Sequence, residues 1–531
     1  MSSFVAHALP ILQAKAHACV RGSEESRIDF MANLFVVCTH LQETESSADM
    51  RDEIPILSPK PINGWDDVPE AVQQVAAERS APAYAALMAL LLSLDQQFPW
   101  TFADGEKPPR WAIDISIPGG EHADARGTVH CWIRPLSDLR RLMLKRGGPT
   151  DYRYRPIDRL RCLGMFWDRG LIPRLRPMPW PARLAPALIE QSGRRLGHGS
   201  FRVALCPLDG PFWPRFTLHP GARQFAIDAS APMHAPEQLE AHLDELLAQA
   251  RTHEMDVLVF PELTIDAQTL TWLQQRLGQE SFPPPNIAGS FHVPHGETLR
   301  NRAPVLDQDG RALWSHDKRG HFRVMGRELR AMSRAASESG KPSLFHGTLP
   351  AEHDADEKYL EGIHHGDTLH VFDAPLGRVA VLICADALDS SHGYRSLVEA
   401  ASIDLLLIIG MSPKTADFLR WAEELRRQQT AVLFVNTGCL LQRRPRLDDP
   451  EAVAAFMSLP WRGQKHPVRV RWRHGGSVEV TGGGADDVWT PIDADPDALT
   501  LLPGGRGLVV NLGAWWRETF PLRTMYSGRK V

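Results

Sequence analysis

The pattern of hydrophobic and polar positions is most regular between about residues 200 and 515. Short apolar runs at 201–206 and 257–260 predict buried strands, and the leucines of 236–253 between them recur at helical spacing. A similar alternation continues from 378 to 436. Because strand, helix and strand in succession favour a parallel strand pair, we expect an α/β fold for this part of the chain.

Residues 1–195 show a weaker pattern, from which we expect a separate N-terminal domain of mixed α and β structure. Residues 68–97 have helical spacing interrupted by Pro82, and 111–117 alternate as a half-buried strand does. From 134 to 195 the chain is rich in arginine and proline, with aromatic residues interleaved, and such a mixture can bind nucleic acid through phosphate contacts and base stacking. Acidic residues are interspersed and no known binding motif frames them, so we favour a solvated or interface surface.

Composition and charge fit an ordinary globular protein. The 531 residues are 43% hydrophobic and 23% charged, and the formal net charge of -5 gives no overall attraction to nucleic acid or an anionic membrane. The first residues lack a secretory-signal pattern and the aliphatic runs are far shorter than the roughly 20 residues that span a bilayer, so we expect a cytoplasmic protein without a membrane segment. The seven cysteines are scattered and the histidines show no metal-ligand spacing, so we expect neither disulfides nor a metal nor another cofactor.

Three reactive side chains each come directly after a predicted strand. Glu262 follows the second buried run, Lys318 follows a predicted hairpin over 301–316, and Cys384 ends the apolar run 378–383. Taken singly, the glutamate and the lysine would be exposed charges and the cysteine a buried core residue. Ligands bind in the crevice beyond the carboxyl ends of parallel strands, so together these side chains indicate a site with a thiol nucleophile.

The order Glu262, Lys318, Cys384 and the residues around them resemble the nitrilase, or carbon-nitrogen hydrolase, superfamily. The matching positions are 257–262, 287–290, Asn301, Gly310, 316–318, Gly377, 381–386, 404–409, 435–438, 475–477 and 507–511. The resemblance implies an α-β-β-α sandwich that commonly pairs into homodimers or larger homo-oligomers. It divides the chain into an N-terminal domain of unknown function (1–195), a hydrolase domain (200–516) with insertions near 320–366 and 440–474, and a tail (517–531).

The chemistry implied by the resemblance needs a nucleophile, a proton acceptor and a positive environment for developing negative charge. These roles fall to Cys384, Glu262 and Lys318, with the backbone N–H of Ala385 as a second donor to the oxyanion. A thioester at the cysteine is the implied intermediate.

Members of this superfamily often carry a second glutamate between the lysine and the cysteine. Glu357 and Glu361 are the candidates in this chain. The spacing does not decide between them, and we favour Glu357.

We expect a hydrolase of a non-peptide carbon-nitrogen bond that acts on a small-molecule amide or carbamoyl compound in preference to a nitrile. The chain lacks the Ser-Gly-Gly-x-Asp-Ser loop of a glutamine-dependent NAD synthetase and the membrane spans of an apolipoprotein N-acyltransferase. The residue after the cysteine is Ala385 where the superfamily usually has an aromatic side chain, and this departure leaves the substrate open. The alternative is a metabolite-binding scaffold or sensor on the same fold, whose N-terminal domain recruits a protein or nucleic acid.

Overall fold

The computed structural model divides the chain into two compact units, Met1–Pro186 with Asp373–Pro375 and Ala187–Phe372 with Leu376–Val531. The structure describes residues 3–45, 64–77, 83–95, 110–118, 124–133, 160, 163–169, 174–178, 201–208, 216–227, 236–253, 255–280, 286–338, 345–346, 348–374, 377–388, 394–401, 403–427, 430–438, 453–459, 467–472, 478–481, 499–501 and 508–512.

The first unit packs helices against an antiparallel sheet with the order β1-β2-β3. Its elements are α1 (Ser3–Val20), α2 (Glu24–Glu45), the 3-10 turn η2 (Trp65–Asp67), α3 (Val68–Ala77), α4 (Ala83–Asp95), β1 (Arg110–Ile117), β2 (Ala125–Ile133), β3 (Leu163–Asp168) and β4 (Arg174–Met178). Helix α2 contacts all three strands of the sheet, and Leu34, Leu91 and Val129 belong to one core. Strand β1 alternates as its sequence predicts, with Ile115 buried and Ser116 exposed. Most of the arginine-rich stretch 134–195 lies outside the described residues.

The second unit contains two large sheets. The first has the order β10-β11-β9-β8-β5-β24-β23, with β12 beside β11, and the second runs β22-β21-β20-β19-β18-β17-β16 within this unit. The strands of the first sheet are β5 (Arg202–Leu205), β8 (Val257–Val259), β9 (Asn286–Ile287), β10 (Phe291–His295), β11 (Thr298–Leu306), β12 (Ala312–Asp317), β23 (Leu499–Leu501) and β24 (Leu508–Asn511). Those of the second are β16 (Thr368–Ala374), β17 (Gly377–Ile383), β18 (Leu405–Gly410), β19 (Ala431–Asn436), β20 (Val453–Ser458), β21 (Val468–Trp472) and β22 (Val478–Thr481). The parallel pairing of β5 with β8 and of β17, β18 and β19 confirms the parallel pairs that the strand-helix-strand pattern predicts.

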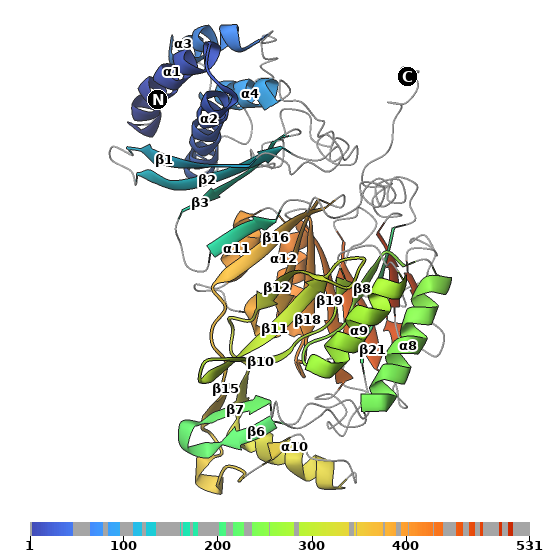
Figure 1. Ribbon diagram of the computed structural model, residues 1–531. Helices are drawn as coiled ribbons and strands as arrows, with labels where there is room; N and C mark the ends of the chain where they lie inside the picture. The colour runs from blue at the N-terminus through green and yellow to red at the C-terminus, as the bar shows by residue number, and fades with distance from the viewer. Residues whose placement is uncertain are drawn as a thin grey trace. The chain divides into compact units, whose positions relative to one another are not determined.

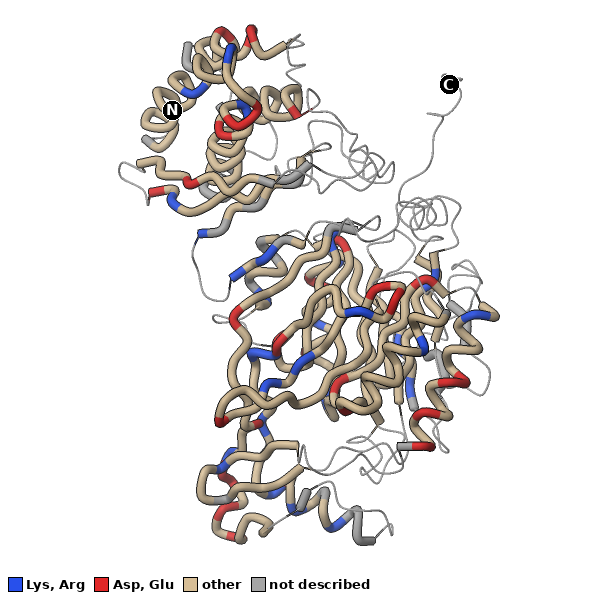
Figure 2. Tube along the Cα trace, in the orientation of Figure 1, with Lys and Arg blue, Asp and Glu red and all other residues tan. Residues whose placement is uncertain are grey.

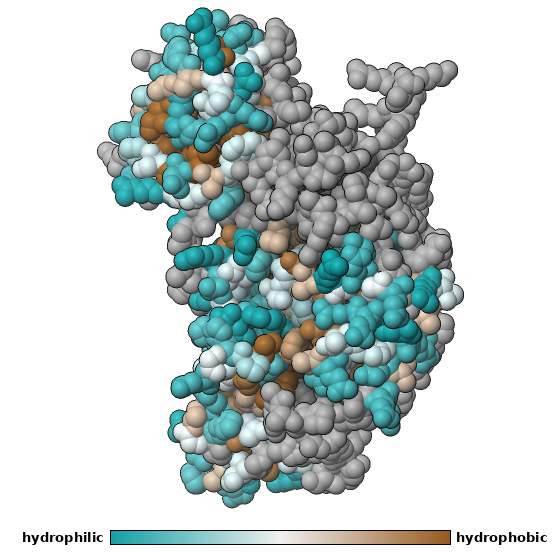
Figure 3. Space-filling model, in the orientation of Figure 1, coloured by the Kyte–Doolittle hydropathy of each residue, from teal (hydrophilic) through white to brown (hydrophobic). Residues whose placement is uncertain are grey.

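Helices flank both large sheets (Figure 1). Helices α8 (Pro236–Thr252) and α9 (Ala267–Glu280) share a core with the first sheet, while α12 (Ala416–Arg427) packs on β19 and β20 of the second and α11 (Tyr394–Ala400) follows β17 along the chain. Figure 2 shows acidic residues along α8, and Figure 3 shows a mainly hydrophilic surface over α8 and α9. This arrangement is the mixed α/β fold with several sheets that the sequence predicts.

A third, smaller sheet includes strands from the region near 320–366, where the sequence predicts an insertion. It has the order β13-β15-β7-β6-β14 and is accompanied by α10 (Gly326–Glu338). Its strands are β6 (Phe216–His219), β7 (Gln224–Ile227), β13 (Arg323–Met325), β14 (Phe345–His346) and β15 (Lys358–Glu361), with the 3-10 turns η3 (Pro220–Ala222) and η4 (Glu352–Asp354) between them. Strands β15 and β14 pair with β7 and β6, which lie more than 100 residues earlier in the chain.

The second region expected to be an insertion, 440–474, contributes β20 and β21. Every residue of β20 is buried, and the strand pairs with β19, so the described part of this region belongs to the sheet. Among the residues that the structure describes, no helix combines the length and the apolar character needed to cross a membrane.

Candidate active site

Four reactive side chains from different strand ends lie in one buried cluster. Glu262 follows β8, Lys318 follows β12, Glu361 ends β15, and Cys384 follows β17 as the first residue of the turn η5 (Cys384–Ala387). Between 0% and 2% of the surface of each residue is exposed. Strands β12 and β17 are in contact although they belong to different sheets, which brings the lysine and the cysteine to the same place.

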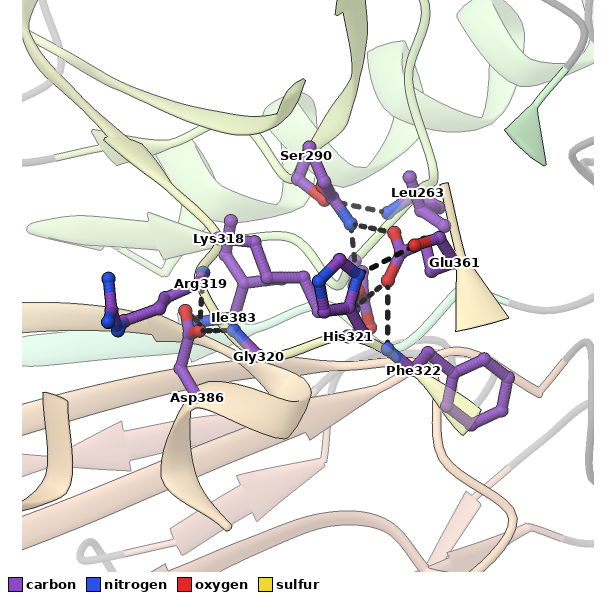
Figure 4. A network of polar contacts seen from close by, with 12 residues as sticks. Leu263, Ser290, Lys318, Arg319, Gly320, His321, Phe322, Glu361, Ile383 and Asp386 are labelled. Carbon is purple, nitrogen blue, oxygen red and sulfur yellow. Dashed lines mark hydrogen bonds and ion pairs between the residues drawn. The ribbon is translucent and has the colours of Figure 1, made fainter. Parts of the chain in front are cut away.

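An ion-pair network around Lys318 forms the centre of the site, and we name Lys318, Glu262, Glu361 and Asn301 the lysine cluster. The ammonium Nζ donates to Oε1 of Glu262 and to Oε2 of Glu361, both at 2.6 Å. The side-chain amide of Asn301 donates to Oε1 of each glutamate at 2.9 Å. Figure 4 shows Lys318 and Glu361 within this network. A lysine held between two buried carboxylates is a fixed positive charge in a region with little screening by water.

The three charged groups of the lysine cluster differ in how firmly they hold a proton. Burial alone would lower the pKa of Lys318, but the two carboxylates raise it above its usual range. Burial alone would raise the pKa of Glu361, but Lys318 and a hydrogen bond from His292 hold it well below its usual range. Burial raises the pKa of Glu262, against the effect of Lys318, and the negative charge of Glu361 raises it further. Glu262 is therefore the carboxyl group of the pair that takes up a proton more readily.

The thiol of Cys384 is hydrogen-bonded to Glu262. Burial raises the pKa of Cys384 well above its usual value, and the negative charge of Glu262 raises it further, while Lys318 and the backbone of Met411 act in the opposite direction. The resting cysteine is thus a protonated thiol. Its proton has an acceptor already in place in the Glu262 carboxylate.

The backbone takes unusual conformations at two points of the site. Leu263, directly after Glu262, has φ 54°, and Cys384 has φ 43°, although neither residue is a glycine. Such conformations cost on the order of 1–3 kcal/mol each and persist only where the surroundings impose them. The N–H of Leu263 donates to Oγ of Ser290 at 3.1 Å, which supports the first of them (Figure 4). Strain of this kind clusters at functional sites.

A second buried carboxylate lies two residues after the cysteine, and we name it and its donors the Asp386 network. Oδ1 of Asp386 accepts the backbone N–H groups of Arg319 and Gly320, both at 2.7 Å. Oδ2 accepts Nε2 of His316 at 2.9 Å and the N–H of Ile383 at 3.2 Å. The network therefore ties the segment around Lys318 to the turn that carries Cys384, as Figure 4 shows.

Gly320 is required by the close approach of these two segments. A Cβ at this position would lie 2.7 Å from the backbone carbon of Ala385 and 2.8 Å from its oxygen. Any larger residue would push the Lys318 segment away from the turn that begins at Cys384. The sequence alone gives no sign of this contact, because it joins positions 65 residues apart.

The second glutamate of the cluster is Glu361, and not Glu357, which we favour from the sequence. The side chain of Glu357 is 41% exposed and pairs with Arg223 at 2.8 Å. Glu357 precedes β15 and Glu361 ends it, and four residues of strand span about 13 Å. Burial alternates along the strand, with Tyr359 and Glu361 buried and Lys358 exposed. An acidic residue at an inward position of a strand is the signal that could have selected Glu361.

The other residues singled out from the sequence have clear positions. Ala385 is half-buried in the first turn of η5, where backbone N–H groups have no partner within a helix. Asn301 matches the superfamily pattern, and the structure adds its contacts with both glutamates. His292, which no pattern in the sequence singles out, donates to Glu361.

Lys318 occupies the space between the two glutamates. The histidines near the site are engaged with protein groups: His316 with Asp386, and His321 with His365 through Nε2 atoms 3.0 Å apart. Within the described part of the chain, no group of three or more His, Cys, Asp or Glu side chains is arranged to hold a metal ion. The arrangement suits acid-base and nucleophilic chemistry.

No protein-family model matches the chain, and no curated protein matches it. Among solved structures, the chain is similar to Nit3 of Saccharomyces cerevisiae (11% identity, 61% of this chain and 96% of that chain, TM-score 0.34). It is also similar to an amidase from a Nesterenkonia species (14% identity, 60% of this chain and 93% of that chain, TM-score 0.28). A third structure is a glutamine-dependent NAD+ synthetase from Acinetobacter baumannii (17% identity, 45% of this chain, TM-score 0.27), of which the match spans only 38%. Nit3 and the amidase, two of the solved structures that this chain is similar to, are members of the nitrilase superfamily.

Proposed function

We propose that the protein is a hydrolase of non-peptide carbon-nitrogen bonds in which Cys384 is the nucleophile. The observation that supports this most strongly is the connected set of hydrogen bonds from the cysteine thiol to Glu262, from Lys318 to Glu262, and from Lys318 to Glu361. A buried cation, a carboxylate that takes up protons and a thiol at a strand end are the parts that acyl transfer from nitrogen needs.

The first half of the reaction forms a thioester. As Sγ of Cys384 attacks the carbonyl carbon, its proton passes to Glu262, which is already hydrogen-bonded to it. The carbonyl oxygen becomes an oxyanion, for which Lys318 and the backbone N–H of Ala385 are the donors. Glu262 then gives the proton to the leaving nitrogen, the carbon-nitrogen bond breaks, and ammonia or an amine departs.

The second half of the reaction hydrolyses the thioester. Glu262 takes a proton from water, and the hydroxide attacks the thioester carbon. The second oxyanion uses the same donors, and the carbon-sulfur bond breaks with return of the proton to the sulfur. The products are a carboxylic acid, or a carbamic acid in the case of a carbamoyl substrate, and the free thiol.

Glu361 has a different task from Glu262 in this scheme. Its carboxylate holds Lys318 in place at 2.6 Å and balances its charge without itself taking up a proton. A lysine paired with Glu262 alone would lose its counter-charge each time Glu262 is protonated. Glu361 keeps Lys318 an ammonium throughout the cycle.

An amide or a carbamoyl compound is the substrate class that we propose, in preference to a nitrile. We also propose that the chain works as a homodimer or a larger homo-oligomer in a reducing compartment, where a free catalytic thiol is maintained. The described cysteines, including Cys384, are unbridged.

The test is release of ammonia or amine from a panel of amides, carbamoyl amino compounds, glutamine and simple nitriles. Cys384→Ala should abolish release, and Cys206→Ala should not. Cys206 is a suitable control because it is also buried in the second unit, and burial raises the pKa of Cys206 to about 12. Release that survives in Cys384→Ala would refute the proposal, and no release by a folded protein across the panel would favour the metabolite-binding scaffold.

A further inference from the structure

His292 lies behind the lysine cluster, on the side of Glu361. Its side chain is fully buried, and Nε2 lies 2.9 Å from Oε1 of Glu361. Its other ring nitrogen, Nδ1, accepts the backbone N–H of Ile227, the last residue of β7, at 3.1 Å. Because a backbone N–H can only donate, Nδ1 carries no proton, and the proton of the neutral ring is on Nε2. His292 is therefore a donor to Glu361 with a fixed tautomer.

Glu361 receives four hydrogen bonds, which is about the number a carboxylate can accept. Oε1 accepts from His292 and Asn301, while Oε2 accepts from Lys318 and from the N–H of Phe322 at 3.2 Å. His292 and Asn301 are directly opposite each other in the pairing of β10 with β11. Because the register of the sheet sets these two residues side by side, both can donate to the same oxygen of Glu361.

Glu262 is held differently, although Lys318 and Asn301 bind both glutamates. It accepts from Lys318 and Asn301, and its further partner is the thiol of Cys384. His292 is thus the side chain that distinguishes the two glutamates. Among the residues that the structure describes, His321 also approaches Glu361, but its Nδ1 contacts the backbone oxygen of Glu361 and not the carboxylate.

We propose that His292 is a positioning residue that holds Glu361 as the permanently ionised partner of Lys318, so that Glu262 alone exchanges protons with Cys384. This inference rests on the proposed function. Without the donor, one oxygen of Glu361 would lose a charge-assisted hydrogen bond in a buried site, and the two glutamates would compete more evenly for the proton and for Lys318. His292 acts only through Glu361.

Two variants of the full-length protein separate this role from simple packing. In His292→Gln, the amide oxygen can accept from Ile227 and the amide nitrogen can donate to Glu361. In His292→Leu, the side chain fills similar space with neither group. We expect kcat in His292→Leu to fall by roughly tenfold to a hundredfold, the effect of losing a hydrogen bond to a charged group, with KM nearly unchanged. His292→Gln should restore most of the rate.

A double-mutant cycle shows whether the effect passes through Glu361. In a Glu361→Gln background, His292→Leu should not lower kcat further, because the neutral amide has no negative charge for a donor to stabilise. A packing role would instead give the same loss in both backgrounds. Equal rates for His292→Leu and His292→Gln would overturn the proposal, and so would additive effects in the cycle. If His292→Leu does not fold, a hundredfold loss of rate in His292→Gln would overturn it.

A second measurement needs no substrate and therefore separates this proposal from the proposed function. Nitrogen-15 spectra of histidine-labelled protein at pH 7 should contain the signals of a ring with a protonated Nε2 and an unprotonated Nδ1. These signals should disappear in His292→Gln. That result would support the donor role even if no amide is hydrolysed. The opposite tautomer at His292 would contradict it, even if the protein proves to be an active hydrolase.

Discussion

Two networks of buried carboxylates adjoin Cys384, and they differ in the donors that satisfy them. In the lysine cluster, Glu262 and Glu361 share a side-chain cation, and one of them also accepts the thiol. In the Asp386 network, three of the four donors are backbone N–H groups, which are uncharged and do not give up their protons. In the proposed mechanism the first network moves a proton, whereas the second holds the turn at Cys384 in place. Burial of a carboxylate therefore does not identify a catalytic acid; the nature of its donors does.

Removal of the cation should have the largest effect on the lysine cluster. Lys318→Met leaves two buried carboxylates without their partner, so we expect a loss of about 3–5 kcal/mol in the free energy of unfolding. Turnover should fall by at least about 10²- to 10³-fold through loss of the oxyanion donor. Urea unfolding and ammonia release measure the two effects. Lys358→Met is the matched control, because Lys358 is exposed on β15, and an equal loss there would contradict the central role of Lys318.

Replacement of Glu361, the second glutamate of the lysine cluster, should have the next largest effect on turnover. Glu361→Gln keeps the shape of the side chain but removes the charge that balances Lys318, and we expect kcat to fall by about 10²-fold. Glu357→Gln changes only a partly exposed ion pair with Arg223 and should leave kcat unchanged and stability within about 1 kcal/mol. Loss of activity in the Glu357 variant with retention in the Glu361 variant would reverse the assignment.

The pH dependence distinguishes the proton-exchanging group from the fixed ones. Burial raises the pKa of Glu262 above its usual 4.5, so the carboxylate needed as a base is lost as the pH falls through this raised value. The profile of kcat/KM should therefore rise with pH across an acid limb that lies above pH 4.5. The raised pKa of Lys318 predicts no loss from lysine deprotonation below about pH 10. An acid limb below pH 4.5 would argue against Glu262 as the base.

Disruption of the Asp386 network should have the smallest effect of this series. Asp386→Asn replaces one acceptor oxygen by a donor that faces other donors, so we expect a loss of about 1–3 kcal/mol in stability. Activity should fall only as far as the turn at Cys384 shifts, by roughly tenfold, and the acid limb should stay in place. A displaced acid limb in this variant would show that Asp386 also takes part in proton exchange.

The sequence predicts the parts of the site that lie at the ends of apolar strands. Glu262 and Cys384 follow runs of buried residues, and Lys318 follows the hairpin of β11 and β12, so local pattern and turn chemistry place them. The choice between Glu357 and Glu361 depends on β15, which pairs in parallel with β7 from a distant part of the chain. Register set by such tertiary pairing leaves little trace in the local sequence.

The supporting contacts are still harder to predict. Asp386 binds backbone groups of Arg319 and Gly320, and His292 meets Glu361 only because three strands from separate segments converge. Backbone amides carry no sequence signal, and a lone histidine in a strand has many ordinary roles. The side chains proposed as nucleophile, base and cation can thus be selected from the sequence, whereas the groups that orient them require the structure.

The most direct test of the account is to detect the thioester on Cys384. Wild-type protein would be mixed with an amide that it cleaves, quenched in acid during the first turnovers and digested for mass spectrometry. We predict that the peptide containing Cys384 gains the mass of the acyl group and that this adduct is absent from Cys384→Ala. Ammonia release without any adduct on Cys384, at a rate unchanged by Cys384→Ala, would contradict the assignment of the nucleophile.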